Sequence, residues 1–266
     1  MSQINDEFLD VDFEKQPQFV FGDLGLGAFG PRMSSYESAQ PTLSESQIAA
    51  EIEKINEAGG GAELLVKYVL NQGREGSCVA NAFTQANMVI QALQFGKHKV
   101  TPLSPISLYK RIGRSPGSGA MVSDGIEEMT DRGILPLDTP ENRARFGSAV
   151  MPATGFYEKY PSDWEGTAAK FKGGEYHIVK SVEGLFTALC CQHPVVVGRE
   201  GHSICYLRPM VRNGRRVVMY VNSWGNWGAA GGDFGYGFGF DTESQVRKSA
   251  SWAVAVRSVV IPSDLK

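Results

Sequence analysis

Cys78 lies six residues after Gln72, with Gly73 and Gly76 between them. A cysteine thiolate is a nucleophile, and a glutamine amide can donate a hydrogen bond to an oxyanion that forms beside the sulfur. The two glycines let the backbone bend sharply, so that the Gln72 amide can point back toward Cys78. This spacing predicts a thiol nucleophile with an amide donor beside it.

The residues after Cys78 predict the helix that positions it. Apolar residues recur there at helical spacing, and Gly96 follows as a stop. They are Val79, Ala82, Phe83, Ala86, Ile90 and Leu93. We expect an amphipathic helix with Ser77 as its N-cap. Unpaired backbone N–H groups and the helix dipole would then favour the Cys78 thiolate and lower its pKa.

The segment GSCVANA, residues 76–82, resembles the active-site segment of papain-like cysteine peptidases, most closely the branch found in bacteria, archaea and their viruses. In that family the cysteine attacks a peptide carbonyl, a distant histidine is the base, and a glutamine completes the oxyanion hole. An asparagine orients the histidine. The resemblance therefore assigns these catalytic roles to Cys78, Gln72 and two residues farther along the chain.

The segment VNSWGNWG, residues 221–228, is similar to the Asn-Ser-Trp-Gly block of the same family. His202 opens an apolar strand-like run about twenty residues earlier; alone, it would more often be a structural histidine. The resemblance implies that His202 is the base, that Asn222 orients it, and that Trp224 covers their hydrogen bond. It also implies that Trp224 is one of the substrate-binding residues. A local exclusion of water strengthens such a bond.

Residues 104–109 and 118–126 also match the family branch in order and spacing. The resemblance implies that Gly119 and Ala120 offer their backbone to an extended peptide substrate, and that Met121 forms a wall of the main specificity pocket. Read from the sequence alone, Gly119 is as well explained as a loop glycine. Secreted members of the family have a disulfide cysteine where this chain has Glu75 and a tryptophan where it has Val79.

The hairpin between His202 and Asn222 tests the catalytic interpretation. Asn213-Gly214 is a strong hairpin signal. A regular two-residue turn there would place Asn222 on the face opposite His202, because side chains alternate along a strand. The catalytic arrangement therefore requires a bulge or an odd loop, and we expect a three-residue loop at Arg212-Asn213-Gly214.

The resemblance covers about residues 63–260 and implies an α+β, papain-like fold. We expect a helical subdomain, about residues 63–140, and an antiparallel β-barrel-like subdomain, about 141–266, with the cleft between them. Residues 1–62 are expected to form an N-terminal arm or pro-region-like extension. It contains a helix after Ser44 or Ser46 that ends at the glycines 59–61.

The role of this arm has two interpretations. Apolar residues in its first half could lie in the cleft and inhibit the site: Phe19, Phe21, Leu24, Leu26 and Phe29. Alternatively, the arm packs on its own domain or on a neighbouring subunit, and an assembly partner for it is a further expectation.

The remaining elements are read from local patterns. We expect a helix that is capped near Ser123 and ended by Gly133, a helix at residues 181–192 that ends before Pro194, and a buried strand at 195–198. In residues 231–240, four aromatic side chains are expected to alternate toward one face of a closing strand. They are Phe234, Tyr236, Phe238 and Phe240.

Composition narrows the range of functions. The net charge of −3 gives no basic footprint, so nucleic acid is not an expected partner. No secretory signal and no membrane-spanning run are found, so we expect no membrane partner and a cytoplasmic or virion-associated location.

The adjacent Cys190 and Cys191 do not resemble a disulfide framework, which favours reduced thiols. A peptide or protein substrate and no cofactor are expected.

Two alternatives remain. Cysteines and histidines close in sequence could bind zinc, although strand alternation would put His202 and Cys205 on opposite faces. That set is Cys190, Cys191, His193, His202 and Cys205. The other histidines, His98 and His177, are expected to be ordinary surface or capping residues.

The second alternative is a papain-like module that serves as a structural or assembly component, for example of a virus particle.

Overall fold

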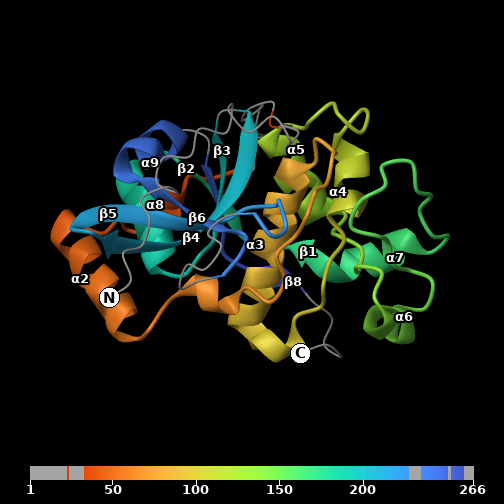
Figure 1. Ribbon diagram of the computed structural model, residues 1–266, viewed down its shortest axis with the longest axis horizontal. Coiled ribbons are helices and arrows are strands. Elements are labelled where there is room, and N and C mark those ends of the chain that lie inside the picture. The colour runs from red at the N-terminus through yellow and green to blue at the C-terminus, as the bar shows by residue number, and fades with distance from the viewer. Residues whose placement is uncertain (1–22, 24–32, 200, 228–234, 251–252, 261–266) are drawn as a thin grey trace.

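The computed structural model describes residues 23, 33–199, 201–227, 235–250 and 253–260. The chain has an α+β architecture in which a long helix, α3, lies between a group of shorter helices and an antiparallel sheet (Figure 1). The α-helices of the described residues are α1 Tyr36–Ala39, α2 Glu45–Glu57, α3 Cys78–Phe95, α4 Pro105–Ile112, α5 Val122–Asp131, α6 Pro140–Phe146, α7 Trp164–Ala168, α8 Val182–Cys190 and α9 Glu243–Ser249. Short 3₁₀ turns are η3 Ala62–Leu65, η4 Lys97–Lys99 and η5 Ala169–Phe171.

The main sheet has the strand order β2-β7-β3-β4-β5-β6, with every pairing antiparallel. A separate pair joins β1 to β8. The strands are β1 Lys172–Gly173, β2 Tyr176–Val179, β3 Val195–Arg199, β4 His202–Arg212, β5 Arg215–Val221, β6 Phe238–Thr242, β7 Ala253–Val256 and β8 Val259–Val260.

The two faces of the sheet border the two larger apolar clusters of the described residues, and a smaller third cluster comprises Met210, Val217, Met219 and Phe240. One core lies between the sheet and the helices α3, α4 and α5, and it also includes Phe171. The other lies between the opposite face and the helices α2, α8 and α9. Cys205 of β4 contributes to the first core, whereas its neighbours Ile204 and Tyr206 contribute to the second. This alternation fixes which side chains of β4 share a face with His202.

Helix α3 begins at Cys78 and ends at Phe95, with Gly96 as its C-cap, as the sequence predicted. The expected amphipathic pattern is wrong, because every residue from Cys78 to Ala92 is buried, while Leu93 is 38% exposed. Such a helix is enclosed on all sides rather than half covered. Ser77 occupies the N-cap position, but its side chain makes no capping bond to the backbone and instead accepts from Asn81 Nδ2 at 3.0 Å.

The other predicted elements are present, with shifted ends. Helix α2 follows Ser44, whose side chain and that of Gln47 form a reciprocal capping box. The helix that was predicted to be capped near Ser123 has its N-cap position at Met121, two residues earlier. In the closing strand β6, Phe238 and Phe240 pair with β5, and Tyr236 precedes the strand and is 52% exposed. Phe234 lies outside the described residues.

The β4–β5 hairpin closes on a two-residue turn, so the expected three-residue loop is wrong. Arg212 pairs directly with Arg215, and Asn213 and Gly214 have φ values of 49° and 72°. The alternative that the sequence allowed, a bulge, is present instead. Tyr206 pairs with Tyr220, but Arg208 pairs with Met219, so Leu207 is an extra residue in β4. If the pairing of Tyr206 with Tyr220 and of Cys205 with Val221 is continued by one residue, Asn222 lies opposite Ile204.

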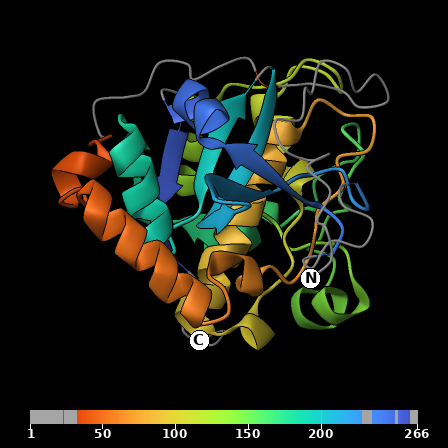
Figure 2. The same ribbon diagram turned by 60° about the vertical axis from the view of Figure 1, so that its left-hand side comes forward.

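Part of the N-terminal extension belongs to the core of the β half. Tyr36, Ile48 and Ile52 are buried in the core that α8 and the sheet share, and Figure 2 shows α2 lying along α8. The backbone at Ser34 accepts from Ile178 N at 3.2 Å, which adds a short parallel pairing to the edge strand β2. Glu37 Oε1 accepts from the backbone N–H groups of Lys180 and Ser181. Residues 33–57 are thus part of the folded domain.

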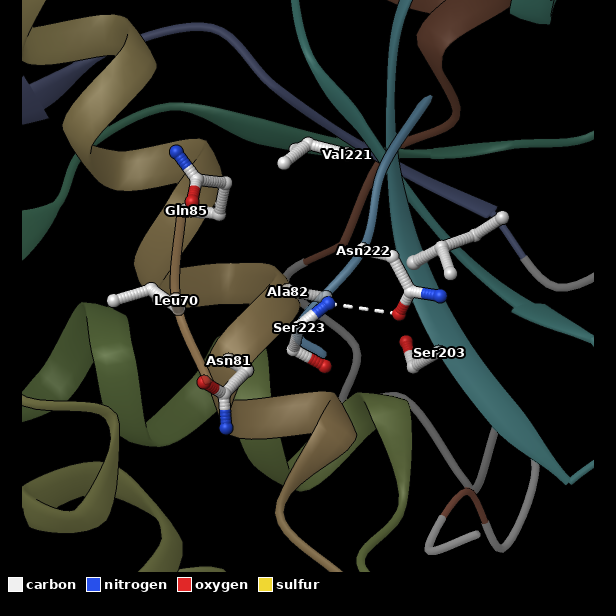
Figure 3. Close-up of a pocket in the computed structure, with 9 residues that line it drawn as sticks. Leu70, Asn81, Ala82, Gln85, Ser203, Val221, Asn222 and Ser223 are labelled. Carbon is white, nitrogen blue, oxygen red and sulfur yellow. Dashed lines mark hydrogen bonds between the residues drawn. The ribbon is translucent and has the colours of Figure 1, made fainter. Parts of the chain in front are cut away.

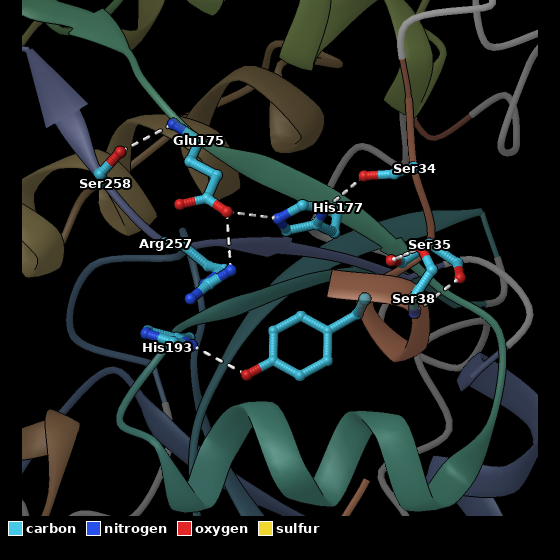
Figure 4. Close-up of polar contacts among 9 residues, drawn as sticks. Ser34, Ser35, Ser38, Glu175, His177, His193, Arg257 and Ser258 are labelled. Carbon is cyan, nitrogen blue, oxygen red and sulfur yellow. Dashed lines mark hydrogen bonds and ion pairs between the residues drawn. The ribbon is translucent and has the colours of Figure 1, made fainter. Parts of the chain in front are cut away.

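Two histidines hold this N-terminal segment (Figure 4). His177 Nδ1 lies 2.8 Å from Ser34 Oγ, and its Nε2 lies 2.9 Å from Glu175 Oε1. The Tyr36 hydroxyl shares a hydrogen bond of 3.0 Å with His193 Nδ1. The expectation that His177 is a surface residue is wrong, since only 6% of it is exposed. No helix of the described residues is long and apolar enough to cross a membrane.

Candidate active site

His202 and Asn222 form a buried hydrogen bond at the sheet end of the site. His202 Nε2 lies 2.7 Å from Asn222 Oδ1, and both residues are at most 2% exposed. The same Oδ1 accepts from Ser223 N at 2.7 Å, which fixes the direction of the amide. An amide oxygen only accepts hydrogen bonds, so Nε2 carries the proton. This tautomer leaves Nδ1 as the basic nitrogen of the ring.

Trp224 covers this hydrogen bond. Its ring stacks on the His202 imidazole with a centroid distance of 4.5 Å and an interplanar angle of 27°. Trp227 packs edge-on against Trp224 at 5.3 Å. Trp224 is only 4% exposed, so little of the indole can meet a substrate. The contact excludes water from the imidazole–amide pair and strengthens it.

The surroundings of His202 favour its neutral form. Burial lowers the pKa of His202 to about 4, the Asn222 hydrogen bond acts in the opposite direction, and the Arg199 cation lowers the pKa further. Arg199 is the direct cross-strand partner of His202 and pairs with the buried carboxylate of Asp241. A neutral imidazole at neutral pH is able to accept a proton.

Cys78 is the first residue of α3 and is completely buried. It therefore lies among the first-turn N–H groups, which have no acceptor within the helix. One turn further, Asn81 and Ala82 line a cavity of about 10 Å³ together with Ser203 and Asn222 (Figure 3). The first turns of α3 thus face the strand ends that carry His202 and Asn222.

Gln72 connects the two halves at this point. Its backbone N–H donates to Ser223 O at 2.8 Å, and its Oε1 accepts from Ser223 Oγ at 2.6 Å. Its Nε2 donates to Glu75 O at 2.8 Å. Gly73 has φ +60°, as the sharp bend after Gln72 requires. The sequence did not indicate the role of Ser223, although this residue lies inside the Asn-Ser-Trp-Gly block.

The turn at Gly119 and Ala120 packs against the segment before Cys78. A side chain at Gly76 would place its Cβ 3.0 Å from Gly119 N, so this close approach favours glycine. The hydroxyl of Tyr109 accepts from Gly119 N at 3.2 Å and donates to Ser115 O at 2.8 Å. Gly119 has φ +69°, and Met121, at the start of α5, is 39% exposed. The substrate-binding roles of these residues stay predictions.

Asp23 of the N-terminal extension lies between the two halves. It forms an isolated parallel bridge with Ala120, and its backbone N–H donates to Gly201 O at 2.8 Å. Gly201 directly precedes His202. The apolar residues that the sequence suggested for the cleft, Phe19 to Phe29, lie outside the described residues.

The remaining cysteines are free thiols. Burial raises the pKa of Cys190 to about 12 and raises that of Cys205 further. Among the residues that the structure describes, no three His, Cys, Asp or Glu side chains are grouped so that they could hold a metal ion. Cys205 also faces the core opposite to the one bordered by Ile204 and Tyr206, on the far side of β4 from His202.

The architecture is that of papain-like cysteine proteases. Xylellain, a cysteine protease from Xylella fastidiosa, has a TM-score of 0.61 and 19% identity, with 91% of this chain and 97% of that chain covered. Digestive procathepsin L 3 of the Tenebrio molitor larval midgut has a TM-score of 0.55 and 17% identity, over 74% and 67% of the two chains. A recombinant stem bromelain precursor has a TM-score of 0.57 and 14% identity, over 96% and 81%.

No protein-family model matches the chain, and no curated protein matches its sequence. At these identities the solved structures establish the fold and leave the activity to be argued from the site.

Proposed function

We propose that this protein is a cysteine peptidase that cleaves peptide bonds with Cys78 as nucleophile and His202 as base. The observation that carries the proposal is the buried His202–Asn222 hydrogen bond under Trp224, placed at the end of the sheet that the first turns of α3 face. Because Nε2 carries the proton of the neutral ring, Nδ1 is the nitrogen that can accept the proton of Cys78. Asn222 holds the ring, and Gln72 donates to the oxyanion.

The reaction then has two stages. His202 Nδ1 takes the proton of Cys78, the sulfur bonds to the substrate carbonyl carbon, and the carbonyl oxygen becomes an oxyanion beside the Gln72 amide and the Cys78 N–H. The C–N bond breaks as His202 returns the proton to the leaving amine. Water, deprotonated by His202, then attacks the thioester and releases the acid and the Cys78 thiol.

The test combines labelling with hydrolysis. We expect a cysteine-directed epoxide to label Cys78 alone, with the label lost in His202→Ala, and the same two residues to be required for cleavage of fluorogenic peptides. Cys190→Ser is the matched control, because its raised pKa keeps that thiol protonated at neutral pH. Labelling at Cys190 or Cys191, or cleavage that survives Cys78→Ala, would reject the proposal. A chain that is folded but unreactive would favour a structural module.

A further inference from the structure

Glu75 attaches the loop of Gln72 to a distant part of the helical half. Its Oε1 accepts from two consecutive backbone N–H groups, Gly155 N at 2.9 Å and Phe156 N at 2.9 Å. A carboxylate that accepts from backbone amides forms a charge-assisted bond, which is stronger than a neutral one. The contact joins residues that are eighty positions apart in the chain.

The backbone of Glu75 holds Gln72 itself. Gln72 Nε2 donates to Glu75 O at 2.8 Å, and Glu75 N donates to Gln72 O at 3.2 Å, so the two residues close a tight turn. The other end of the Gln72 carboxamide accepts from Ser223. Movement of Glu75 would therefore rotate the Gln72 amide about its contact with Ser223.

The loop that receives the carboxylate is itself anchored. Lys110 Nζ donates to Phe156 O at 2.6 Å, and the Phe156 ring packs edge-on against Tyr109 at 5.4 Å. Gly155 has φ +113°, and a Cβ there would lie 2.8 Å from the Glu158 side chain. The loop that carries the two N–H groups is thus held against α4 by Lys110 and Tyr109.

We infer that Glu75 is a positioning residue for the oxyanion hole, whose carboxylate fixes the Gln72 amide through the bonds to Gly155 and Phe156. The inference rests on the proposed function and extends it to a residue that touches no reacting atom. An amide donor that is held in place before the reaction needs no reorganisation when the oxyanion forms. Glu75 therefore acts on the step that develops negative charge on oxygen.

Two reactions of the full chain separate this role from a structural one. Peptide hydrolysis develops an oxyanion, whereas alkylation of Cys78 by iodoacetamide does not. In Glu75→Ala we expect kcat for peptide hydrolysis to fall at least about tenfold, a part of the hundred- to thousandfold loss when a donor is removed outright. KM and the alkylation rate should stay near the wild-type values, since substrate binding and the thiol are unaffected.

Two further variants complete the experiment. Glu75→Gln keeps an oxygen that can accept from both N–H groups, so it should recover most of kcat. Glu158→Ala removes an exposed carboxylate from the same loop and should behave as wild type. Equal losses of hydrolysis and alkylation in Glu75→Ala, or no loss of either, would overturn the inference. A wild-type chain without Cys78- and His202-dependent hydrolysis would instead remove the proposed function and this inference with it.

Discussion

His202 and Asn222 lie 2.7 Å apart through Nε2 and Oδ1, although a regular β4–β5 hairpin would turn them to opposite faces of the sheet. The single extra residue Leu207 restores their common face. Because the bond is buried and stacked under Trp224, the imidazole has one orientation and one tautomer.

Replacing Asn222 should impair catalysis more than substrate binding. In Asn222→Ala the imidazole loses its orienting acceptor, and we expect kcat to fall by about a hundredfold, the order that a small misplacement of a catalytic group costs. Ser203→Ala is the control, since Ser203 lines the same cavity but donates to Val197 O. Steady-state kinetics of the folded variants check this, and a wild-type kcat in Asn222→Ala would contradict the assigned role.

The pH dependence of activity should reflect the buried imidazole. The pKa of His202 is lowered to about 4, mainly by burial, and only the neutral ring accepts the thiol proton. We therefore expect kcat/KM to stay high as pH falls below 6.5 and to be lost as pH passes through about 4. A pH profile at constant ionic strength measures this limb. A limb centred at 6.5 would show that the imidazole is solvated.

Trp224 should control the pH at which kcat/KM is lost on the acid side of the profile. In Trp224→Ala, water reaches the imidazole, the cost of charging it falls, and the limb should move from about pH 4 toward 6.5. Trp227→Ala removes an indole that touches Trp224 but leaves the His202 stack in place, so its limb should move less. Equal shifts in both variants would argue against the covering role of Trp224.

The backbone contact of Asp23 suggests that the N-terminal extension restrains the site. Proline at this position removes the N–H that donates to Gly201, whereas alanine keeps it. We expect Asp23→Pro to hydrolyse small peptides faster than wild type and Asp23→Ala to match wild type. Rates of full-length variants test this, and equal rates in all three would remove the inhibitory hypothesis. Deleting residues 1–60 would be less informative, because Tyr36, Ile48 and Ile52 are core residues.

Acid should weaken the fold through His193. Burial, together with the Arg257 cation, lowers its pKa to about 4. The unfolded chain therefore binds more protons than the folded protein between pH 6.5 and 4, and stability is lost as pH falls through this window. Free energies of unfolding from urea titrations at several pH values measure the slope. His193→Gln should reduce this slope, and an unchanged slope in that variant would contradict the role of His193.

The sequence predicted the parts of this site that depend on local patterns. The helix from Cys78 to Gly96 follows from its spacing. The Asn213-Gly214 dipeptide located the tip of the hairpin, although the expected three-residue loop is a two-residue turn. The sequence indicated that the hairpin needs a bulge or an odd loop, but it did not indicate that the bulge lies at Leu207. The reason is that β4 is buried on both faces from His202 to Met210. In such a strand the alternation of apolar and polar residues, which would reveal an extra residue, is absent.

Contacts between residues far apart in the chain were the other feature that the sequence could not predict. His177 is buried because Ser34 and Tyr36, some 140 positions earlier, fold against β2. Glu75 looks like a surface residue in the sequence, and its role depends on amides in a loop with no periodic pattern. Side chains that bind distant backbone leave no local signal.

The extra residue in β4 also limits how this hairpin can change in evolution or design. Removing Leu207 alone would exchange the faces of Asn222 and Ser223 relative to His202, so that the hydroxyl would replace the amide beside the imidazole. Insertions at the Asn213-Gly214 tip that preserve strand pairing carry no such penalty. Length variation among homologues of this protein should therefore concentrate at the tip, while the interval from His202 to Arg208 keeps a constant length.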